Sequence, residues 1–561
     1  MSKITIDNKL IEFIKGQTII EAARDNGISI PHFCWHPKLS VSGNCRICLV
    51  EVEQMQKLVI ACSTIAAEGM VVHTKSEKTV AAQNAVMEFF LINHPLDCPI
   101  CDEAGECKLQ DYAYKYGVGE SRFIEEKVHK DKRVELGPRV MFDGERCISC
   151  SRCIRFCDEI AKDPELTFVQ RGDRVTIVTY PGQQMDNSYS MNTIDICPVG
   201  ALTSRDFRFK ARVWDMSSSK SICVGCSRGC NTEIWVRNNE ILRLTPRLND
   251  EVNSYWMCDH GRLNTFKYVN ADDRSNSPQL MVEGQHINIG WDEAFAEAAS
   301  RLKAFSKDQV AVIGSAFATC EDNFIIAKFA KSVIGTKHVD FIRHIDSEFG
   351  DDILKQNDVA PNSLGAETVG VHPANNGLSI DGIIKAIQEK KIKAIYVIED
   401  DILTSFPELE SEIAALDLLI VHASNKNKTS AYADIIFPAA TYAEKNGTMI
   451  NFQGRVQRLK PAVSTLDSDR ALEGMSMSRL DKFGTKYDSW ASGKKCDARS
   501  TWKILLSLSN AFGYKMKFNM AEDVFAEMSK TIIEFKGLNY DDIGENGILI
   551  HTSKAVKQET T

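Results

Sequence analysis

The 561-residue sequence has no apolar run of the roughly 18 residues or more that a membrane-spanning helix needs. Its amino terminus, MSKITIDNKL, has no apolar core of the kind found in secretory signals. Basic residues are not in excess, because 67 Lys and Arg stand against 76 Asp and Glu for a formal net charge of −9. A nucleic-acid-binding surface is normally basic. We therefore expect a cytoplasmic protein with no nucleic-acid partner and no membrane span, so that any link to a membrane runs through another protein.

Cysteine is scarce in the second half of the chain, where only Cys320 and Cys496 follow residue 260. Disulfide scaffolds are typically small secreted domains, and this long chain without a visible signal is neither. Reduced thiols that hold metal in a cytosol-like compartment fit the distribution better.

The first half contains four sets of possible metal ligands. They are His94, Cys98, Cys101 and Cys107; Cys34, Cys45, Cys48 and Cys62; Cys147, Cys150, Cys153 and Cys197; and Cys223, Cys226, Cys230 and Cys258. Soft thiolates select zinc, copper(I) or iron–sulfur clusters. Any one set alone could be a structural zinc site. The sets differ in type and the third has ferredoxin spacing, so we favour a series of redox centres over several zinc knuckles.

The ligand set nearest the amino terminus follows a pattern typical of a β-grasp ferredoxin. ITIDN and LIEFI predict two short strands, and GQTIIEAARDNGI predicts a helix capped by Thr18 with Glu21 and ended by Gly27. The C-x10-C-x2-C-x13-C spacing that begins at Cys34 indicates a [2Fe–2S] site, although plant-type ferredoxins have four residues in the first gap.

The second set along the chain, HPLDCPICDEAGEC, follows a helix expected over residues 77–93. Its apolar residues are expected largely on one side: Val80, Ala81, Val86, Met87, Phe90 and Leu91. We expect His94 to ligate a [4Fe–4S] cluster with the three cysteines. A neutral imidazole in place of a thiolate removes one negative charge and alone raises the reduction potential, although hydrogen bonding and burial can override this effect.

The third set begins with a bacterial ferredoxin run, ERCISCSRCIRFC, and ends in DICPVGAL. In two-cluster ferredoxins the fourth cysteine of such a run ligates the other cluster, but no second full run is present here. We therefore expect Cys197 to complete a [4Fe–4S] site with Cys147, Cys150 and Cys153, and Cys157 to be a buried thiol.

The fourth set, CVGCSRGC with Cys258, predicts a small β-rich [4Fe–4S] unit with a hairpin that turns at Asn238–Asn239. From about residue 273 the character changes. GWDEAFAEAASRLKAF predicts a helix, and DQVAVIGSA, KAIYVIEDD and LDLLIVHAS predict short strands, which together indicate a parallel α/β domain. The turn GSAFAT has one glycine, so an ordinary strand-to-helix turn is preferred to a nucleotide site.

With all four sets in place, the chain resembles the large iron–sulfur subunit (the G subunit) of bacterial respiratory complex I, NADH–quinone oxidoreductase. The motifs that carry the resemblance are SGNCRICLVEV, HPLDCPICDEAGECKLQDYAY, ERCISCSRCIRFCDEIA, DICPVGAL and CVGCSRGC. The resemblance implies one [2Fe–2S] and two [4Fe–4S] clusters on the route from flavin to quinone. It also implies a further [4Fe–4S] cluster, found only in some members, that lies off this route. The whole complex would couple electron transfer to proton translocation.

The implied partners are a flavin/NADH-binding subunit, other peripheral-arm subunits and a quinone-side subunit. The implied location is the cytoplasmic face of the inner membrane. GWDEAF and ADIIFPAATYAEKNGTMINFQGRVQ resemble the molybdopterin oxidoreductase fold more weakly. The expected cofactors are one [2Fe–2S] and three [4Fe–4S] clusters, with no molybdenum or pterin and no catalytic residue beyond the cluster ligands.

The expected fold is multidomain, α+β and then α/β. We expect a β-grasp [2Fe–2S] ferredoxin over 1–78, a His(Cys)3 [4Fe–4S] module over 79–120 and a ferredoxin-like [4Fe–4S] module over 138–212. A molybdopterin-oxidoreductase-type [4Fe–4S] module is expected over 216–272, followed by a degenerate molybdopterin-oxidoreductase-like domain over 273–561.

Other functions stay open at this point. A formate-dehydrogenase-like catalytic subunit would need a cysteine or selenocysteine before a histidine that reaches the metal, but FIRHIDSE has none before His344, and Cys320 lies at the wrong place. The diaphorase subunit of an NAD-reducing hydrogenase would be much shorter and lack 273–561. A purely structural cluster protein would be expected to carry a single cluster.

Overall fold

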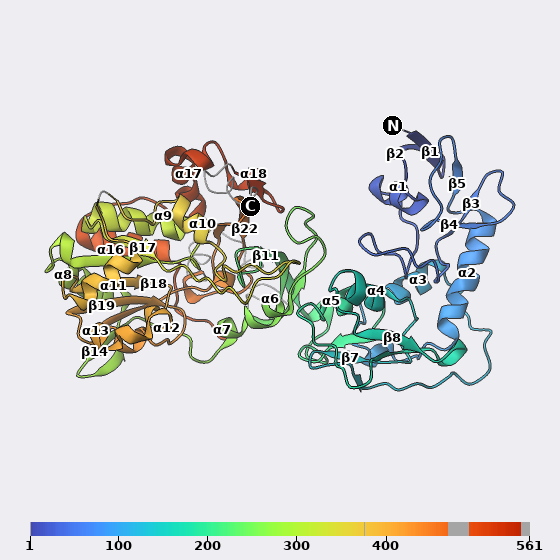
Figure 1. Ribbon diagram of the computed structural model, residues 1–561, viewed down its shortest axis with the longest axis horizontal. Helices are drawn as coiled ribbons and strands as arrows, with labels where there is room; N and C mark the ends of the chain where they lie inside the picture. Colours follow the sequence, from blue (N-terminus) through green and yellow to red (C-terminus); the bar gives the residue numbers. More distant parts are fainter. Residues whose placement is uncertain (1, 375, 469–492, 551–561) are drawn as a thin grey trace, which may run out of the picture. The chain divides into compact units, whose positions relative to one another are not determined.

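The computed structural model describes residues 2–374, 376–468 and 493–550. The chain forms two compact units, Met1–Asp215 and Met216–Thr561 (Figure 1). No helix in the described ranges combines the length and the apolar character needed to cross a membrane.

Unit 1 begins with a five-stranded mixed sheet in the order β2-β1-β5-β3-β4. Its strands are β1 (Ser2–Ile6), β2 (Lys9–Phe13), β3 (Leu49–Val52), β4 (Val59–Ile60) and β5 (Val71–His73). Helix α1 (Ile19–Asp25) has the predicted capping box, in which the Thr18 backbone N–H donates to Glu21 Oε2 at 2.8 Å. Both predicted strands and the helix are confirmed.

Helix α2 (Glu77–Ile92) has the expected bounds, but of the apolar residues expected largely on one side only Met87 is buried. Val80 and Ala81 are exposed, and the buried residues are Thr79, Gln83 and Met87. The reason is that polar contacts join the helix to the sheet. Thr79 Oγ1 accepts the Glu51 N–H at 3.1 Å, and Gln83 Nε2 donates to a β3 carbonyl at 3.2 Å.

The rest of unit 1 consists of short elements around long loops. Helices are η1 (Cys98–Ile100), α3 (Lys108–Tyr116), α4 (Arg152–Glu159), η2 (Gly172–Arg174), α5 (Asn192–Asp195) and η3 (Val213–Asp215). The strands β6 (Val134–Glu135), β7 (Val140–Phe142) and β10 (Leu202–Ser204) form one antiparallel sheet, and β8 (Leu166–Val169) pairs with β9 (Thr176–Thr179).

Unit 2 opens with an antiparallel sheet of β11 (Ser217–Ile222), β12 (Asn231–Arg237) and β13 (Glu240–Pro246). The predicted hairpin turn is present, with Asn238 and Asn239 both at positive φ, 51° and 62°. Asparagine tolerates this left-handed conformation better than most residues. Helices α6 (Asp259–Asn264) and α7 (Lys267–Asn270) follow.

The centre of unit 2 is a seven-stranded sheet in the order β15-β14-β20-β19-β18-β16-β17 (Figure 1). Its parallel strands are β16 (Val310–Gly314), β17 (Val339–Phe341), β18 (Ala394–Ile398), β19 (Leu418–Ala423) and β20 (Ile435–Pro438). An antiparallel hairpin of β14 (Gln279–Val282) and β15 (Gln285–Asn288) extends one edge. The predicted parallel α/β arrangement is therefore present.

Helices cover both faces of this sheet, because alternate strand residues belong to different core clusters. Val310 and Val312 pack with α8 (Trp291–Leu302), α9 (Cys320–Lys328) and α16 (Thr501–Phe512). Ala311 and Ile313 pack with α11 (Ile380–Gln388), α12 (Ile402–Ser405) and α13 (Glu410–Ala414). Burial on both faces explains the continuous apolar strands that the sequence shows.

The remaining elements of unit 2 add a three-stranded sheet of β21 (Gly447–Ile450), β22 (Arg455–Leu459) and β23 (Ile548–Leu549). Within the described residues the other helices are η4 (Lys307–Gln309), η5 (Phe329–Ile334), α10 (Ser363–Thr368), η6 (Pro407–Leu409), η7 (Ser430–Tyr432), η8 (Tyr442–Glu444), α17 (Ala521–Thr531), η9 (Ile533–Phe535) and α18 (Tyr540–Ile543).

Candidate iron–sulfur sites

The ligand set nearest the amino terminus, here the first site, forms one buried group of thiols. Cys34, Cys45, Cys48 and Cys62 are each at most 8% exposed. Their side chains contact one another: hydrogen bonds from Cys45 and from Cys62 lower the pKa of the Cys34 thiol, and a hydrogen bond with Cys62 lowers that of Cys48. The loop that follows α1 supplies Cys34, and the segments that flank β3 and β4 supply Cys48 and Cys62. The structure thus brings all four predicted ligands together.

The second site is a single small cavity. His94, Cys98, Cys101 and Cys107 all face it. His94 lies just beyond α2, Cys98 is the first residue of η1, and Cys107 is the N-cap of α3. Cys101 and Cys107 are buried, whereas Cys98 is exposed.

The imidazole of His94 is suited to bind a metal centre. Burial lowers its pKa to about 4, so the ring is neutral at pH 7. Its Nδ1 atom is buried and has no hydrogen-bond partner within the described part of the chain. A buried polar atom without a partner is costly, and a metal–ligand bond would remove that cost.

The third site is another small cavity. Cys147, Cys150, Cys153 and Cys197 all face it. Burial raises the pKa of Cys147 to about 11, so a thiolate there needs a compensating positive centre. Cys157 lies one turn after Cys153 on α4, is fully buried and is not among the residues that line this cavity.

One short loop, from Cys197 to Gly200, lines both the second and the third cavity. Cys197 lines the third site and Gly200 lines the second. A Cβ atom at Gly200 would overlap the sulfur of Cys101, so only glycine leaves that sulfur in place. The Lys108 N–H donates to the Pro198 carbonyl at 3.1 Å, which ties the same loop to α3.

Two arginines of α4 connect the third site with the first. Arg155 Nη2 donates to the Cys34 carbonyl at 2.6 Å and to the Cys150 carbonyl at 3.4 Å. Arg152 donates to the Trp35 carbonyl at 2.5 Å and to the Ile196 carbonyl at 3.0 Å. Sequence reasoning missed both residues. The only signal, two arginines three positions apart between cysteines, is equally typical of an exposed basic helix face.

The fourth site lies in unit 2, where Cys223, Cys226, Cys230 and Cys258 are all buried. Backbone N–H groups donate to two of the sulfurs. The Gly225 N–H donates to Cys223 Sγ at 3.4 Å, and the Gly261 N–H donates to Cys258 Sγ at 3.3 Å. A Cβ atom at Gly261 would lie 2.7 Å from the Cys223 sulfur. Hydrogen bonds to sulfur of this kind tune cluster potentials.

Cluster ligands surround a volume, because each binds a different iron atom. The ligands of a single zinc ion converge on one point. In the described ranges no group of three His, Cys, Asp or Glu side chains converges on one point as the ligands of a single metal ion do.

Unit 2 also holds a large cavity of about 730 Å³. It lies where the parallel strands end, and residues that follow β16, β17, β18, β19 and β20 line it. Cys320, which sequence analysis placed away from any metal site, does not line it; its sulfur is buried at 3.5 Å from Asn362 Oδ1. His344 lines the cavity and pairs with Asp400 at 3.0 Å.

Five family models match the chain. In order they are a 2Fe-2S iron-sulfur cluster binding domain (1–77), the NADH-ubiquinone oxidoreductase-G iron-sulfur binding region (83–122), the NADH-quinone oxidoreductase subunit 3 ferredoxin-like domain (137–203), the NADH-ubiquinone oxidoreductase NDSU1/NuoG-like 4Fe-4S domain (216–265) and molybdopterin oxidoreductase (353–471).

Curated relatives are named as the G subunit of NADH-quinone oxidoreductase. The protein from Rickettsia bellii (strain RML369-C) is 40% identical over 335 residues, which are 59% of this chain and 48% of that protein. The protein from Streptomyces coelicolor (strain ATCC BAA-471 / A3(2) / M145) is 41% identical over 354 residues, 63% of this chain and 42% of that protein. The chain thus spans about half the length of the curated relatives it matches.

Among solved structures, a chain of an NAD+-reducing [NiFe]-hydrogenase in the H2-reduced state is 30% identical. The match covers 38% of this chain and 91% of that chain, with a TM-score of 0.35. At that TM-score the match defines no shared domain arrangement. The family models and the curated relatives agree with each other, and they relate the iron–sulfur part of this chain to the G subunit of the NADH–quinone oxidoreductases.

Proposed function

We propose that the chain is the large iron–sulfur, electron-transfer subunit of an NADH–quinone oxidoreductase complex. It would accept electrons from a flavin/NADH-binding subunit and pass them towards a quinone-side subunit, while the whole complex translocates protons. The observation that carries the proposal is that unit 1 brings together the residues of three proposed ligand sets, two of them around cavities that share the loop from Cys197 to Gly200.

The proposed cofactors are one [2Fe–2S] cluster on Cys34, Cys45, Cys48 and Cys62 and three [4Fe–4S] clusters on the other sets. When bound, such clusters supply one-electron transfer. The chain's own residues would hold the sulfur ligands, shield most of the ligand cysteines from water by burial and place N–H donors near some of the sulfurs. No side chain is needed as an acid, base or nucleophile.

Arg155 is proposed to fix the spacing of the first and third sites. Its guanidinium spans the carbonyl groups of Cys34 and Cys150, each the carbonyl of a proposed ligand. Because electron transfer depends steeply on distance, a rigid bridge between two ligand loops would keep the rate uniform. The loop from Cys197 to Gly200 would have a similar role between the second and third sites, because its two ends line the two cavities.

The modules proposed over 1–78, 79–120, 138–212 and 216–272 would each hold one cluster. The fourth cluster would lie off the main route, as the family resemblance implies. The other peripheral-arm subunits would be further partners, and the complex would place this chain on the cytoplasmic face of the inner membrane.

Residues 273–561 are proposed to bind no molybdenum or pterin. Molybdopterin carries a phosphate, and the lining of the large cavity does not fit one. Four carboxylates line it, those of Asp346, Glu399, Asp400 and Asp401, and no lysine or arginine is found among its described lining residues. The described residues that line this cavity include no cysteine either. A formate-dehydrogenase-like function therefore has less support, and the domain would serve as a structural cover.

Reduction by NADH through a partner tests the proposed function. The reconstituted full chain is mixed with the flavin/NADH-binding subunit of an NADH–quinone oxidoreductase, and cluster EPR signals are followed after NADH is added. We expect reduction only when both proteins are present, whereas dithionite reduces the chain alone. Reduction by NADH or by formate without a partner would contradict the proposal.

A further inference from the structure

A buried arginine lies between the first and third sites. Arg152 is the first residue of α4, is 3% exposed and lines the third cavity. Its Nη1 donates to the Ile196 carbonyl at 3.0 Å, and its Nη2 donates to the Trp35 carbonyl. These carbonyls belong to the residues next to two proposed ligands, Cys197 and Cys34. One guanidinium group therefore reaches a ligand loop of each site.

No carboxylate neutralises this guanidinium within the described part of the chain. The side chain of Arg152 donates to the two carbonyl groups, and no described Asp or Glu forms an ion pair with it. Arginine stays protonated in proteins, so the group is a full positive charge in the interior of unit 1. A buried charge without a negative partner is costly.

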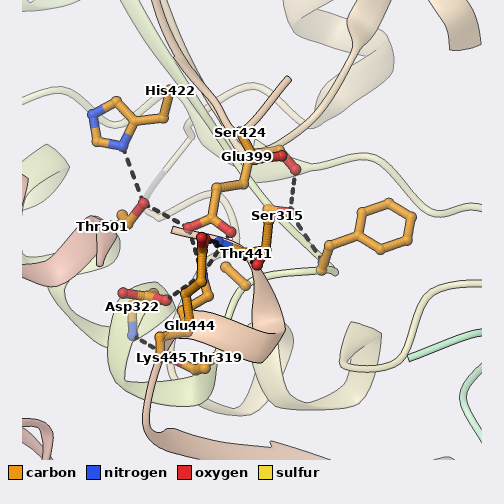
Figure 2. A network of polar contacts seen from close by, with 12 residues as sticks. Ser315, Thr319, Asp322, Glu399, His422, Ser424, Thr441, Glu444, Lys445 and Thr501 are labelled. Carbon is orange, nitrogen blue, oxygen red and sulfur yellow. Dashed lines mark hydrogen bonds and ion pairs between the residues drawn. The ribbon is translucent and has the colours of Figure 1, made fainter. Parts of the chain in front are cut away.

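Two other buried cations of the protein do have carboxylate partners. Beside the second site, Arg146 Nη2 lies 2.7 Å from Asp97 Oδ2. In unit 2, Lys445 Nζ lies 2.6 Å from Glu399 Oε2 and 2.9 Å from Asp322 Oδ2 (Figure 2). The contrast indicates that the negative partner of the arginine between the first and third sites is of another kind.

Proposed ligands are the negative groups that this arginine faces. Burial lowers the pKa of the Arg152 guanidinium, and nearby thiolates oppose that effect. In order of effect they are those of Cys150, Cys197, Cys34 and Cys45. The first two thiolates belong to the third site and the last two to the first site. The charge of one arginine therefore acts on both ligand sets.

An unused donor of the same side chain is a second, independent observation. The Nε atom of Arg152 is buried and has no hydrogen-bond partner among the described residues. A buried N–H without an acceptor is unfavourable. A cluster in the third cavity, which Arg152 lines, would bring sulfur acceptors to this side chain.

We propose that Arg152 is the shared counter-charge of the clusters at the first and third sites and raises the reduction potential of both. Reduction adds one electron, and so one negative charge, to a cluster. A fixed positive charge nearby stabilises the reduced form more than the oxidised form, and the low dielectric of the interior strengthens this effect. Because one charge raises both potentials together, electron transfer between the two clusters keeps nearly the same driving force.

The inference rests on the proposed function, because it takes both clusters as bound. Redox titration of the reconstituted full chain tests it, with EPR detection of the [2Fe–2S] cluster and of the third-site [4Fe–4S] cluster. The signal of the third site is identified by its loss in Cys197→Ser. Iron content and thermal unfolding establish that each variant is loaded and folded.

Two substitutions separate the charge of the side chain from its shape. Arg152→Gln removes the charge and keeps an N–H donor, so the equilibrium constant for reduction should fall about tenfold at both clusters. That fall is about 59 mV for a one-electron couple. Arg152→Lys keeps the charge and should lower the constants by less than about threefold. Arg122→Gln is the matched control, because the Arg122 side chain is 83% exposed and water screens its charge.

The titrations also define what would overturn the inference. Unchanged potentials in Arg152→Gln, a shift of one cluster alone, or equal shifts in Arg152→Gln and Arg152→Lys would each do so. If Arg152→Gln loses a cluster, Arg152→Lys decides: potentials near those of the wild type support the role, and a tenfold fall or loss of both clusters contradicts it. Absence of the clusters from the unchanged chain would instead contradict the proposed function.

Discussion

A single buried ring nitrogen gives the sharpest test at the residue scale. His94 Nδ1 has no hydrogen-bond partner among the described residues, and His94 shares its cavity with three cysteines. We expect His94→Ala to lose one [4Fe–4S] EPR signal and about four irons per chain. His94→Cys should keep the cluster at a lower potential, because a thiolate adds negative charge. The control is His372→Ala, an exposed histidine of unit 2. Unchanged iron content in His94→Ala would remove His94 from the ligand set.

The choice between two cysteines is a second test at this scale. Cys197 lines the third cavity and Cys157 does not, although Cys157 belongs to the ferredoxin run. Cys197→Ser should abolish or strongly alter the EPR signal of the third cluster, whereas Cys157→Ser should leave it intact. Iron analysis of both purified variants checks the spectra. The reverse pattern would mean that the module folds around a different fourth ligand.

The residues that sequence spacing could predict differ from those it could not. Regular intervals mark cysteines, so each of the four sets could be proposed from the sequence, and the structure gathers the members of each set. Arg152, Arg155 and Gly200 could not be found this way, because their roles depend on contacts with segments distant in the chain. Arg155, for example, contacts the carbonyl of a residue 121 positions away.

At the scale of elements, the residues at which a helix or turn begins and ends were easier to predict than the residues that a helix buries. Capping and turn residues act locally, so α1, α2 and the turn at Asn238–Asn239 lie where the sequence indicated. The polar residues on the buried face of α2 could not be predicted, because hydrophobic periodicity takes no account of hydrogen bonds to a neighbouring strand. Thr79 and Gln83 are buried since each makes such a bond. Polar side chains with partners can occupy a buried face at little cost.

The junction of α9, β21 and α18 predicts a pH dependence of stability. Glu321 Oε2 accepts the Thr448 N–H at 2.8 Å, and its Oε1 lies 2.9 Å from the hydroxyls of both Thr448 and Tyr540. Burial raises the pKa of this carboxyl from 4.5 to about 7. The folded protein therefore binds the proton more tightly than the unfolded chain. The resulting stabilisation is complete below about pH 4.5 and is lost as pH rises through about 7.

Glu321→Gln should remove this dependence, because the amide copies the protonated acid. Its oxygen can accept the Thr448 N–H while its NH2 group donates to the two hydroxyls. Between about pH 5 and pH 8, we expect the wild-type chain to lose up to about 3 kcal/mol relative to the variant. Urea unfolding of the full chain at several pH values measures the difference, with Glu293→Gln as the control. Parallel stability curves for wild type and Glu321→Gln would show that Glu321 does not titrate in this range.

At the scale of the whole molecule, the alternation of strands and helices was enough to predict a parallel sheet in unit 2. The cavity at its edge was not predictable, because residues from five separate loops line it. Similarly, the helices α16 and α17 near the end of the chain carry no motif, and tertiary packing of Leu505, Leu508 and Val524 into the main core holds them. Local sequence patterns therefore predict the separate modules. A cavity lined by several loops, in contrast, forms only when the whole fold brings those loops together.

Metal content tests the whole proposed inventory at once. The four ligand sets predict about 14 irons per reconstituted chain, if one site holds a [2Fe–2S] and three hold [4Fe–4S] clusters. Molybdenum and tungsten should stay far below one per chain, because the large cavity presents carboxylates where a phosphate-bearing pterin would need positive charge. Cys258→Ser should lower the iron content by about four and leave the signals of the other clusters in place, since unit 1 holds those sites. Stoichiometric molybdenum or tungsten, or formate oxidation by the isolated chain, would instead support a catalytic subunit of the formate dehydrogenase type.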